Sequence, residues 1–488
     1  MGTRGFFVLQ FLPLHFMQIK NIMKPLSKTK HLHPFHITQE RENNHMNATQ
    51  EQYEQETLAL CDFIKKSPSC YHAVSNMKKI LNGAGFTELT ESRRWNLSAG
   101  GRYYVSRNDS ALISFTIPAF DYLGFNIISS HSDSPSFKIK ENAEICVEGH
   151  YTTLNVEGYG GMLCAPWFDR PLSVAGKVMV KDGDKVASRL VYFDRDLLSI
   201  VNLAIHMNRN ANKEGNSYKL QKDMLPLFSD GDKDASILKL TAKELGIHES
   251  DILGCDLFLV NRMPGTIWGE KNQFYSAPKI DDLQCSYSAT HALIASDCQT
   301  HVCVNAVFDN EEVGSGTKQG ALSDFLGTVL NRINTAAGKD QEDYFVSLTN
   351  SFMVSADNGH ALHPNHTDKS DPTNRPYLNG GVLIKSAANQ KYTTDSVSEA
   401  IFKKILDDAE VPYQVFTNNS DIPGGSTLGN LANQHVSINT IDIGMPQLAM
   451  HSPYETGGVK DTLQLITALS AFYNTSIEAI ADGEYRII

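Results

Sequence analysis

The spacing of apolar positions along the first third of the chain predicts two helices followed by three strands. An apolar helical stripe over 58–64 belongs to a helix that begins near Glu51, and the Ser-Pro-Ser at 67–69 ends it. A second helix is predicted over 71–81, because the Asn-Gly that follows is a usual C-terminal signal. Runs rich in β-branched and aromatic residues within 102–130 predict three strands.

The pattern changes in the middle of the chain and then changes back. Over 139–272, short β-branched runs alternate with glycine and charged turns, which predicts a mostly β insert. Within this insert we expect one helix over 198–209, followed by a polar connector over 210–232. Beyond it, helical periodicity alternates with buried strand-like runs, as in α/β proteins with a central sheet. The chain is therefore predicted to form one discontinuous α/β domain, over 47–138 and 273–488, around the insert.

The first 46 residues follow neither pattern. Residues 5–19 are strongly apolar, yet no small-residue cleavage site follows them and Lys20 comes next. The stretch is also shorter than the ~20 residues that a membrane span needs. We expect residues 1–46 to be a disordered extension or a gene-start artefact, with Met46 as an internal start; a targeting segment is the alternative.

Charge and cysteine content narrow the class of protein. With 43 basic and 55 acidic side chains, the chain carries a formal net charge of −12. Nucleic acid and anionic membranes both require a basic face, so neither is an expected partner. Eight cysteines are scattered without a CxxC pair, in a chain much longer than secreted disulfide scaffolds. We therefore expect a cytoplasmic protein.

Four strand-like runs each lead to residues that can bind a metal ion. These residues are His131, the pair Glu311-Glu312, Asp357 and His451, and a further candidate, Asp281, precedes an apparent helix. Because open α/β sheets bind ligands beyond the carboxyl ends of their strands, residues distant in sequence can converge there. Imidazole nitrogens and carboxylate oxygens are ligands that zinc-like ions accept.

This set of residues can hold two ions. With Asp281 between them, His131 and Asp357 can bind one ion, and Glu312 and His451 the other.

Glu311 is then the expected general base, because neighbouring side chains on an extended segment point apart and Glu311 cannot easily bind the ion that Glu312 binds. Asp133, two residues after His131, is placed to orient its ring. Each residue also has a structural alternative. Asp281 or Asp282 can cap a helix, Asp133 can cap a turn, and adjacent acids are usually solvated.

At these residues the chain closely resembles the aspartyl aminopeptidase family of co-catalytic metallopeptidases, in its bacterial type. The resemblance covers about residues 52–475, and its motifs, in the family's order, are SPSCYHAV, HSDSPSFKIK, GGMLCAPWFDRPLSVAGKV, SAPKIDD, FDNEEVGS, SADNGHALHPN, DIPGGSTLG and QLAMHS. It implies the same metal ligands and base, and it selects Asp281 over Asp282 as the bridge. Two divalent ions per subunit are implied, zinc first, with manganese or cobalt as alternatives.

The resemblance also implies a fold, an assembly and an activity. The fold is a three-layer peptidase domain with a central mixed sheet, carrying an inserted β-rich dimerisation domain. Family members form homo-oligomers, in which dimers assemble into tetrahedral dodecamers, and they remove N-terminal residues, typically acidic, from peptides. A broad-specificity aminopeptidase or a related metal-dependent deacylase is the nearest alternative. A catalytically idle assembly protein is a more distant one, since no ligand is missing.

The family resemblance says less about substrate specificity than about the metal ligands. Lys385 matches a family lysine near the substrate pocket, and Asp421 and Gly425 belong to a substrate-side loop. Asn202 stands where eukaryotic members carry a histidine that completes the neighbouring subunit's site, so that contact and a strict acidic preference are in doubt. Three further histidines look like ligands but fall outside the family's metal set, and we interpret them as structural: His360, His363 and His366.

Overall fold

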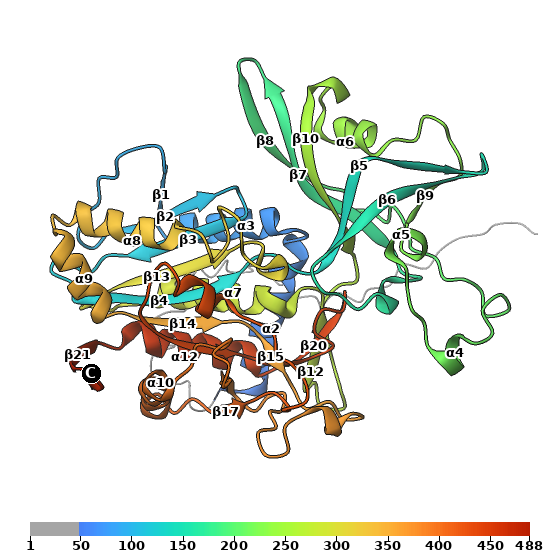
Figure 1. Ribbon diagram of the computed structural model, residues 1–488. Helices are drawn as coiled ribbons and strands as arrows, with labels where there is room; N and C mark the ends of the chain where they lie inside the picture. The colour runs from blue at the N-terminus through green and yellow to red at the C-terminus, as the bar shows by residue number, and fades with distance from the viewer. Residues whose placement is uncertain (1–47) are drawn as a thin grey trace, which may run out of the picture. The chain divides into compact units, whose positions relative to one another are not determined.

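The computed structural model describes residues 48–488 of the chain, so the predictions for residues 1–46 lie outside the described residues (Figure 1). Within the described part, the two predicted N-terminal helices are α2 (Gln50–Lys66) and α3 (Cys70–Gly83). Thr49 begins α2 with a capping box, in which its side chain accepts from the backbone N–H of Gln52. No helix of residues 48–488 is long and apolar enough to cross a membrane.

A nine-stranded mixed sheet forms the centre of the protein. Its strands, in spatial order, are β1 (Thr87–Leu89), β2 (Arg102–Arg107), β3 (Ala111–Thr116), β13 (His301–Phe308), β4 (Gly124–His131), β14 (Phe352–Ala356), β18 (Asn439–Gly444), β16 (Val382–Lys385) and β17 (Tyr413–Phe416). The four middle strands, β13, β4, β14 and β18, are mutually parallel. Their carboxyl ends therefore meet at one edge of the sheet.

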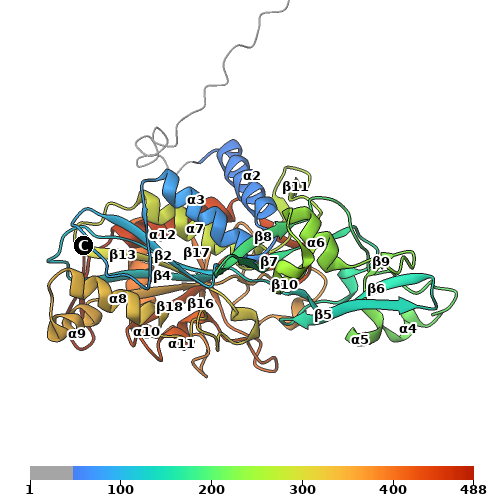
Figure 2. The ribbon, with the colours of Figure 1, turned by 90° about the horizontal axis from the view of Figure 1, so that it is seen from above.

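Helices cover both faces of this sheet, which gives three layers and confirms the predicted α/β fold class (Figure 2). Successive side chains of a strand point to opposite faces of the sheet, so each strand contributes to the apolar core on both sides. Ile128 of β4 faces one core, while its neighbours Phe125 and Ile127 face the other. The first core includes residues of α2, α3, α7 (Ile280–Ala295), α10 (Ser396–Asp408) and α12 (Asp461–Asn474). The second includes residues of α8 (Phe325–Ala336), α9 (Gln341–Thr349) and α11 (Leu428–Ala432).

A separate six-stranded sheet lies between β4 and β11 (Thr266–Trp268) in the sequence. Its order is β8 (Lys185–Tyr192), β7 (Leu172–Asp182), β10 (Ile252–Asn261), β5 (Ser136–Val147), β6 (Tyr151–Tyr159) and β9 (Leu227–Ser229). These strands pair with one another and enclose their own apolar core, which includes Phe137 and Trp167. Strand β11 belongs to a third sheet with β12 (Phe274–Ala277), β20 (Glu455–Gly458), β19 (Pro446–Leu448) and β15 (Gly359–His360).

The helix predicted over 198–209 is wrong. Residues 198–200 are extended instead, because Leu198 exchanges backbone hydrogen bonds with Leu172 on β7. The following segment has no regular structure, and four alternating apolar side chains lie on its surface, each at least 49% exposed: Val201, Leu203, Ile205 and Met207. An amphipathic helix is stable in a protein only where a core can bury its apolar face. Here residues 198–200 pair with the inserted sheet in extended form, and the apolar residues that follow have no core to pack against among residues 48–488.

Asn126 connects the central sheet to the last long helix. It is fully buried on β4, and its side-chain amide donates to the carbonyl oxygens of Phe472, Tyr473 and Thr475 at the end of α12. These are among the carbonyls that a helix cannot satisfy internally.

We predict that Asn126→Ala lowers the free energy of unfolding by about 1–3 kcal/mol, because buried carbonyls lose their donor. Denaturant unfolding of the purified protein measures this change. Asn216→Ala is the matched control, since Asn216 is exposed and both hydrogen bonds of its side chain lie at the surface; it should change stability by less than about 0.5 kcal/mol. Equal effects of the two substitutions would contradict the assigned role.

Candidate metal centre

The carboxyl ends of the four parallel strands bring the predicted site residues together. His131 is the last residue of β4, and Asp357 directly follows β14. The pair Glu311-Glu312 follows β13 after a short turn, and the register places Phe308 at the end of β13 opposite His131. The convergence expected from the order of strands in the sequence is thus present in the structure.

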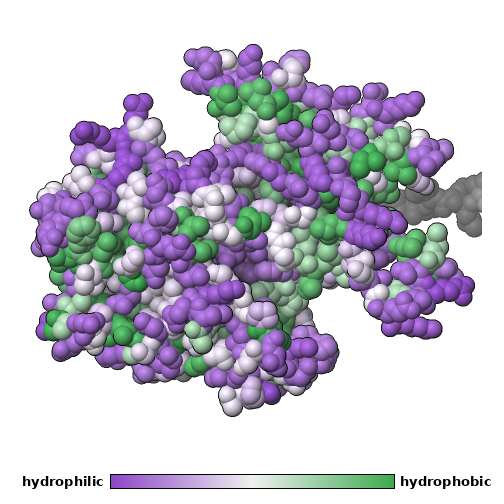
Figure 3. All heavy atoms as spheres, viewed as in Figure 1, coloured by the Kyte–Doolittle hydropathy of each residue, from purple (hydrophilic) through white to green (hydrophobic). Residues whose placement is uncertain are grey.

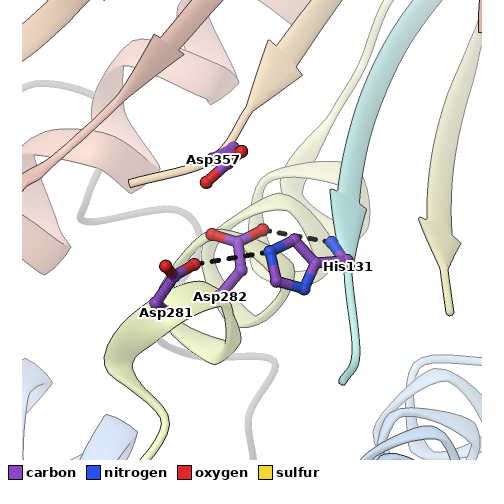
Figure 4. Close-up of side chains that lie close together, drawn as sticks. All are labelled: His131, Asp281, Asp282 and Asp357. Atoms are coloured by element: carbon purple, nitrogen blue, oxygen red, sulfur yellow. Dashed lines mark hydrogen bonds and ion pairs between the residues drawn. The ribbon is translucent and has the colours of Figure 1, made fainter. Parts of the chain in front are cut away.

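Asp281 lies between the two histidines (Figure 4 shows its side with His131). One carboxylate oxygen, Oδ1, is 3.3 Å from Nε2 of His131, and the other, Oδ2, is 3.4 Å from Nε2 of His451. Glu312 Oε2 is also 3.4 Å from this nitrogen of His451. Asp282 faces only the His131 side, where its Oδ2 accepts the backbone N–H of His131 at 3.1 Å.

Three groups of side chains in the described part of the chain have potential ligand atoms within 4.8 Å of one another. The groups are His131 with Asp281, Asp282 and Asp357; His131 with Glu311 and Glu312; and Asp281 with Glu312 and His451. Because His131 and Asp281 each occur in two groups, the three groups form one continuous cluster.

Some carboxylate oxygens of this cluster lack a hydrogen-bond donor among residues 48–488. Asp282 Oδ1 and Glu312 Oε1 are buried and accept no hydrogen bond from the residues that the structure describes. Burial, together with the neighbouring carboxylates, raises the pKa of Glu312 well above its ordinary value and the pKa of Glu311 to about 8. A bound cation would supply what these oxygens lack, so the residues present fit divalent metal ions.

Asp133 organises one side of the cluster. Its backbone carbonyl lies 3.2 Å from Nδ1 of His131 and its Oδ1 lies 3.4 Å from the same nitrogen, so that Nε2 faces Asp281. The two carboxylate oxygens also accept the backbone N–H groups of Glu311 and Glu312, each at 3.2 Å. The predicted contact with His131 is present, and the contact with the Glu311-Glu312 turn was not foreseen.

The backbone geometry expected for Glu311 and Glu312 is wrong. They lie in a 3-10 turn over Glu311–Val313, preceded by Asn310 with a φ of 63°, and not in an extended segment. Both carboxylates approach His131, so neighbouring positions alone do not separate their roles. Only the contacts of Glu311 and Glu312, and not their positions in the chain, can distinguish a base from a ligand.

Sequence reasoning missed two residues that hold the site from outside the cluster. Glu455, buried on β20, accepts the backbone N–H of Asp281 at 3.0 Å and that of His451 at 2.7 Å. A carboxylate four residues after a candidate ligand was a usable signal, as it was for Asp133. Tyr159 donates its hydroxyl to Asp133 at 2.7 Å, and nothing in the local sequence indicated this contact across the inserted sheet.

The three residues expected near the substrate differ in burial: Lys385 lies inside the protein, and Asp421 and Gly425 lie on its surface. Lys385, at the end of β16, is buried and does not lie on the surface, where most lysines are found. Its Nζ donates to the carbonyl of Asn358 at 2.9 Å and lies 3.9 Å from Asp357 Oδ1. Asp421 and Gly425 lie on an exposed loop, where the amide N–H of Asp421 donates to a side chain of the same loop.

The other histidines and Asn202 lie outside the cluster. None of the metal-competent groups in residues 48–488 contains His360, His363 or His366, and the ring centroids of His363 and His366 lie 4.9 Å apart with the planes tilted by 44°. Asn202 is exposed and donates to Asp169 from both its backbone and its side chain, at 2.9 and 2.7 Å.

Fold and cluster together define an α/β metallopeptidase. Residues 63–473 match the family described as "Aminopeptidase I zinc metalloprotease (M18)". The chain therefore belongs to the M18 family of metalloaminopeptidases, which confirms the family indicated by its motifs.

Individual relatives span nearly the whole described chain. "Probable M18 family aminopeptidase 2" of Clostridium novyi (strain NT) is 45% identical over 424 residues, which cover 85% of this chain and 98% of that protein. A chain of the structure described as "Cryo-EM structure of the Ape4 and Nbr1 complex" superposes with a TM-score of 0.83 at 35% identity, covering 88% of both chains. The mApe1 dodecamer of S. cerevisiae gives a TM-score of 0.75 at 28% identity, covering 86% of this chain and 97% of that one.

Metal binding should stabilise the fold, because ions would bind the native carboxylate cluster and not the unfolded chain. We predict that chelation lowers the melting temperature and that zinc at one hundred times its dissociation constant restores about 2.7 kcal/mol of stability. Calorimetry with and without chelator measures this. Asp281→Asn should abolish the response. Asp461→Asn should retain it, because buried Asp461 bonds to Gly458 and Asn379, away from the cluster. Equal responses in both variants would contradict the site.

Proposed function

We propose that this protein is a two-metal aminopeptidase that removes N-terminal residues, preferentially acidic ones, from peptides. The observation that supports it most directly is the position of Asp281, whose two carboxylate oxygens each face a different histidine. A carboxylate in this position can bridge two ions, whereas Asp282 faces one side only. Two-metal hydrolases hold their ions ~3.5–4 Å apart, a separation that one bridging carboxylate can span.

The proposed ligands divide between two positions. His131 and Asp357 would hold one ion, and Glu312 and His451 the other, with Asp281 shared between them; these side chains belong to the groups whose potential ligand atoms lie within 4.8 Å of one another. The contacts support this division, because Glu312 Oε2 lies 3.4 Å from His451 Nε2 and is grouped with Asp281 and His451. Zinc is the first candidate, in agreement with the family's description, and manganese or cobalt can replace it in such carboxylate-rich sites.

Glu311 is the proposed general base. Filling the two ligand sets leaves two carboxylates of the cluster, Asp282 and Glu311. Asp282 already accepts the backbone N–H of His131, so Glu311 is the one proposed to accept a proton. The ions, when bound, supply Lewis acidity for the scissile carbonyl and for the attacking water. Glu311 takes the proton of this water as it attacks the carbonyl carbon and then gives the proton to the leaving amine. Asp133, through its bonds to both backbone N–H groups of the turn, keeps Glu311 in place.

We predict that Glu311→Gln lowers kcat about 10²–10⁴-fold while leaving two ions bound, since the amide keeps the shape but cannot accept the proton. Steady-state kinetics and elemental analysis of the same preparation measure both quantities. Glu399→Gln on α10 is the control, because Glu399 bonds only to Lys403 on the same helix. Retained turnover, or loss of an ion, would contradict the assignment of Glu311 as base.

The preference for acidic residues rests on Lys385, whose buried ammonium lies beside the proposed ligand Asp357. A buried cation at this place favours a substrate carboxylate nearby. The same contacts allow a different role, in which Lys385 only positions Asp357 and the enzyme accepts many N-terminal residues.

The two roles of Lys385 predict different kinetics. If it binds the substrate, Lys385→Met should lower kcat/KM for Asp- and Glu-substrates by at least about tenfold relative to Leu- and Lys-substrates. If it positions Asp357, kcat/KM falls equally for all four substrates, and Lys385 is excluded as the source of an acidic preference. Lys391→Met, an exposed lysine in the same segment, serves as control. N-acylated substrates in the same panel test the alternative of a deacylase.

Assembly and location are part of the proposal. We propose a homo-oligomer, up to the dodecamer of the related mApe1, because the strands of the inserted sheet carry exposed apolar side chains, including Val186, Leu253 and Tyr151. Figure 3 shows apolar surface over this part of the molecule. All eight cysteines are free thiols, which suits a reducing cytoplasm. The net charge of −12 argues against nucleic acid or anionic membranes as partners.

A further inference from the structure

Residues 159–163, which leave strand β6 of the inserted sheet, contact both sides of the candidate metal centre; we refer to them as the β6 exit segment. Tyr159 begins it at the end of β6. Its ring packs edge-on against Phe258 of β10, with centroids 5.5 Å apart, so the inserted sheet fixes its position.

On the His131 side, the β6 exit segment acts through Asp133. The Tyr159 hydroxyl donates to Asp133 Oδ2 at 2.7 Å and accepts from the side-chain amide of Asn310 at 2.8 Å. Asp133 is the residue that contacts His131 Nδ1 and accepts the backbone N–H groups of the Glu311-Glu312 turn. One phenol of the insert therefore fixes a carboxylate on which three site residues depend.

On the His451 side, the β6 exit segment acts directly. The Gly161 carbonyl lies 2.5 Å from Nδ1 of His451, and the Leu163 backbone N–H donates to the His451 carbonyl at 3.1 Å. Because a carbonyl can only accept, Nδ1 carries the hydrogen. In the neutral ring, Nε2 is then the lone-pair nitrogen that faces Asp281 and Glu312.

Gly160 lets the β6 exit segment pass close to the cluster. Its φ is +76°, and a Cβ at this position would lie 3.1 Å from Glu312 Cβ and 3.4 Å from the Glu312 carbonyl oxygen. Gly161, the next residue, has open space where a Cβ would be. The two neighbouring glycines thus differ in what a methyl group would meet.

We propose that the β6 exit segment is a positioning element for metal binding, through which the inserted sheet sets the affinity of both metal positions. It orients His131 through Asp133 and holds His451 in the tautomer and direction that a metal ligand needs. This inference rests on the proposed two-metal site. Partners that orient ligands in this way typically contribute 10–100-fold to metal affinity.

The first test replaces the Tyr159 hydroxyl. Tyr159→Phe keeps the ring packing and removes the bond to Asp133, so zinc affinity should fall about 10–100-fold in competition with a fluorescent chelator. Tyr473→Phe is the matched control, because the buried Tyr473 hydroxyl donates to the Val304 carbonyl at 2.9 Å in the sheet core. The control should lose stability in the metal-free protein without losing zinc affinity.

The second test adds a methyl group to the backbone at a glycine. Gly160→Ala should weaken binding of one ion, the one assigned to Glu312 and His451, and isothermal titration should resolve this as a change in one of two binding steps. Gly149→Ala, in the turn between β5 and β6, is the matched control and should leave both steps unchanged, because Gly149 has a similar φ of +74° but open space where a Cβ would be.

The outcomes separate this inference from the proposed function. If the unmodified protein binds two ions and both Tyr159→Phe and Gly160→Ala bind them with unchanged affinity, the positioning role is overturned while the two-metal site stands. If the unmodified protein does not bind two ions, the proposed function fails first. Loss of affinity in Tyr473→Phe equal to that in Tyr159→Phe would also overturn the inference, because the effect would then be general destabilisation.

Discussion

Mutual repulsion among buried carboxylates is the constraint on which the rest of this structure depends. Five acidic side chains converge at the carboxyl edge of the central sheet, and the cationic partners that residues 48–488 place beside them are two imidazoles and Lys385. Burying a charge without a partner is costly, so such a cluster is stable only if something positive completes it. The elements around the cluster hold these groups at a fixed spacing.

The sheet explains why so much of this site could be predicted from the sequence. Buried parallel strands appear as continuous apolar runs, and the residue that follows each run lies at the same edge of the sheet. The sequence alone therefore predicted that His131, Asp357 and the Glu311-Glu312 pair lie close together. The order of helices and strands predicted the α/β class with a central sheet, since each element carries its own periodicity, whereas the three-layer arrangement was implied by the family resemblance.

What could not be predicted depends on contacts across the chain. The side chain of Tyr159 reaches Asp133 from another sheet, and no periodicity encodes that approach. The 3-10 turn at Glu311 follows from Asn310 adopting a left-handed conformation, which a short polar stretch does not reveal. The helix predicted over 198–209 was wrong because a local pattern was overridden by a contact with a distant part of the chain. Its apolar residues suggested a buried face, but Leu198 pairs with the neighbouring strand and Met207 lies 74% exposed.

The pairing of β4 with β13 has a consequence for how the chain folds. These strands are neighbours in the central sheet, yet the whole six-stranded sheet lies between them in the sequence. Contacts of such large sequence separation close late, because the entropy of forming the loop must be overcome first. The inserted sheet has its own apolar core and shorter connections, so it can form earlier. Once formed, it brings the ends of its sequence together and shortens the loop that β4 and β13 must close. A newly synthesised chain thus gains its metal-binding edge only near the end of folding.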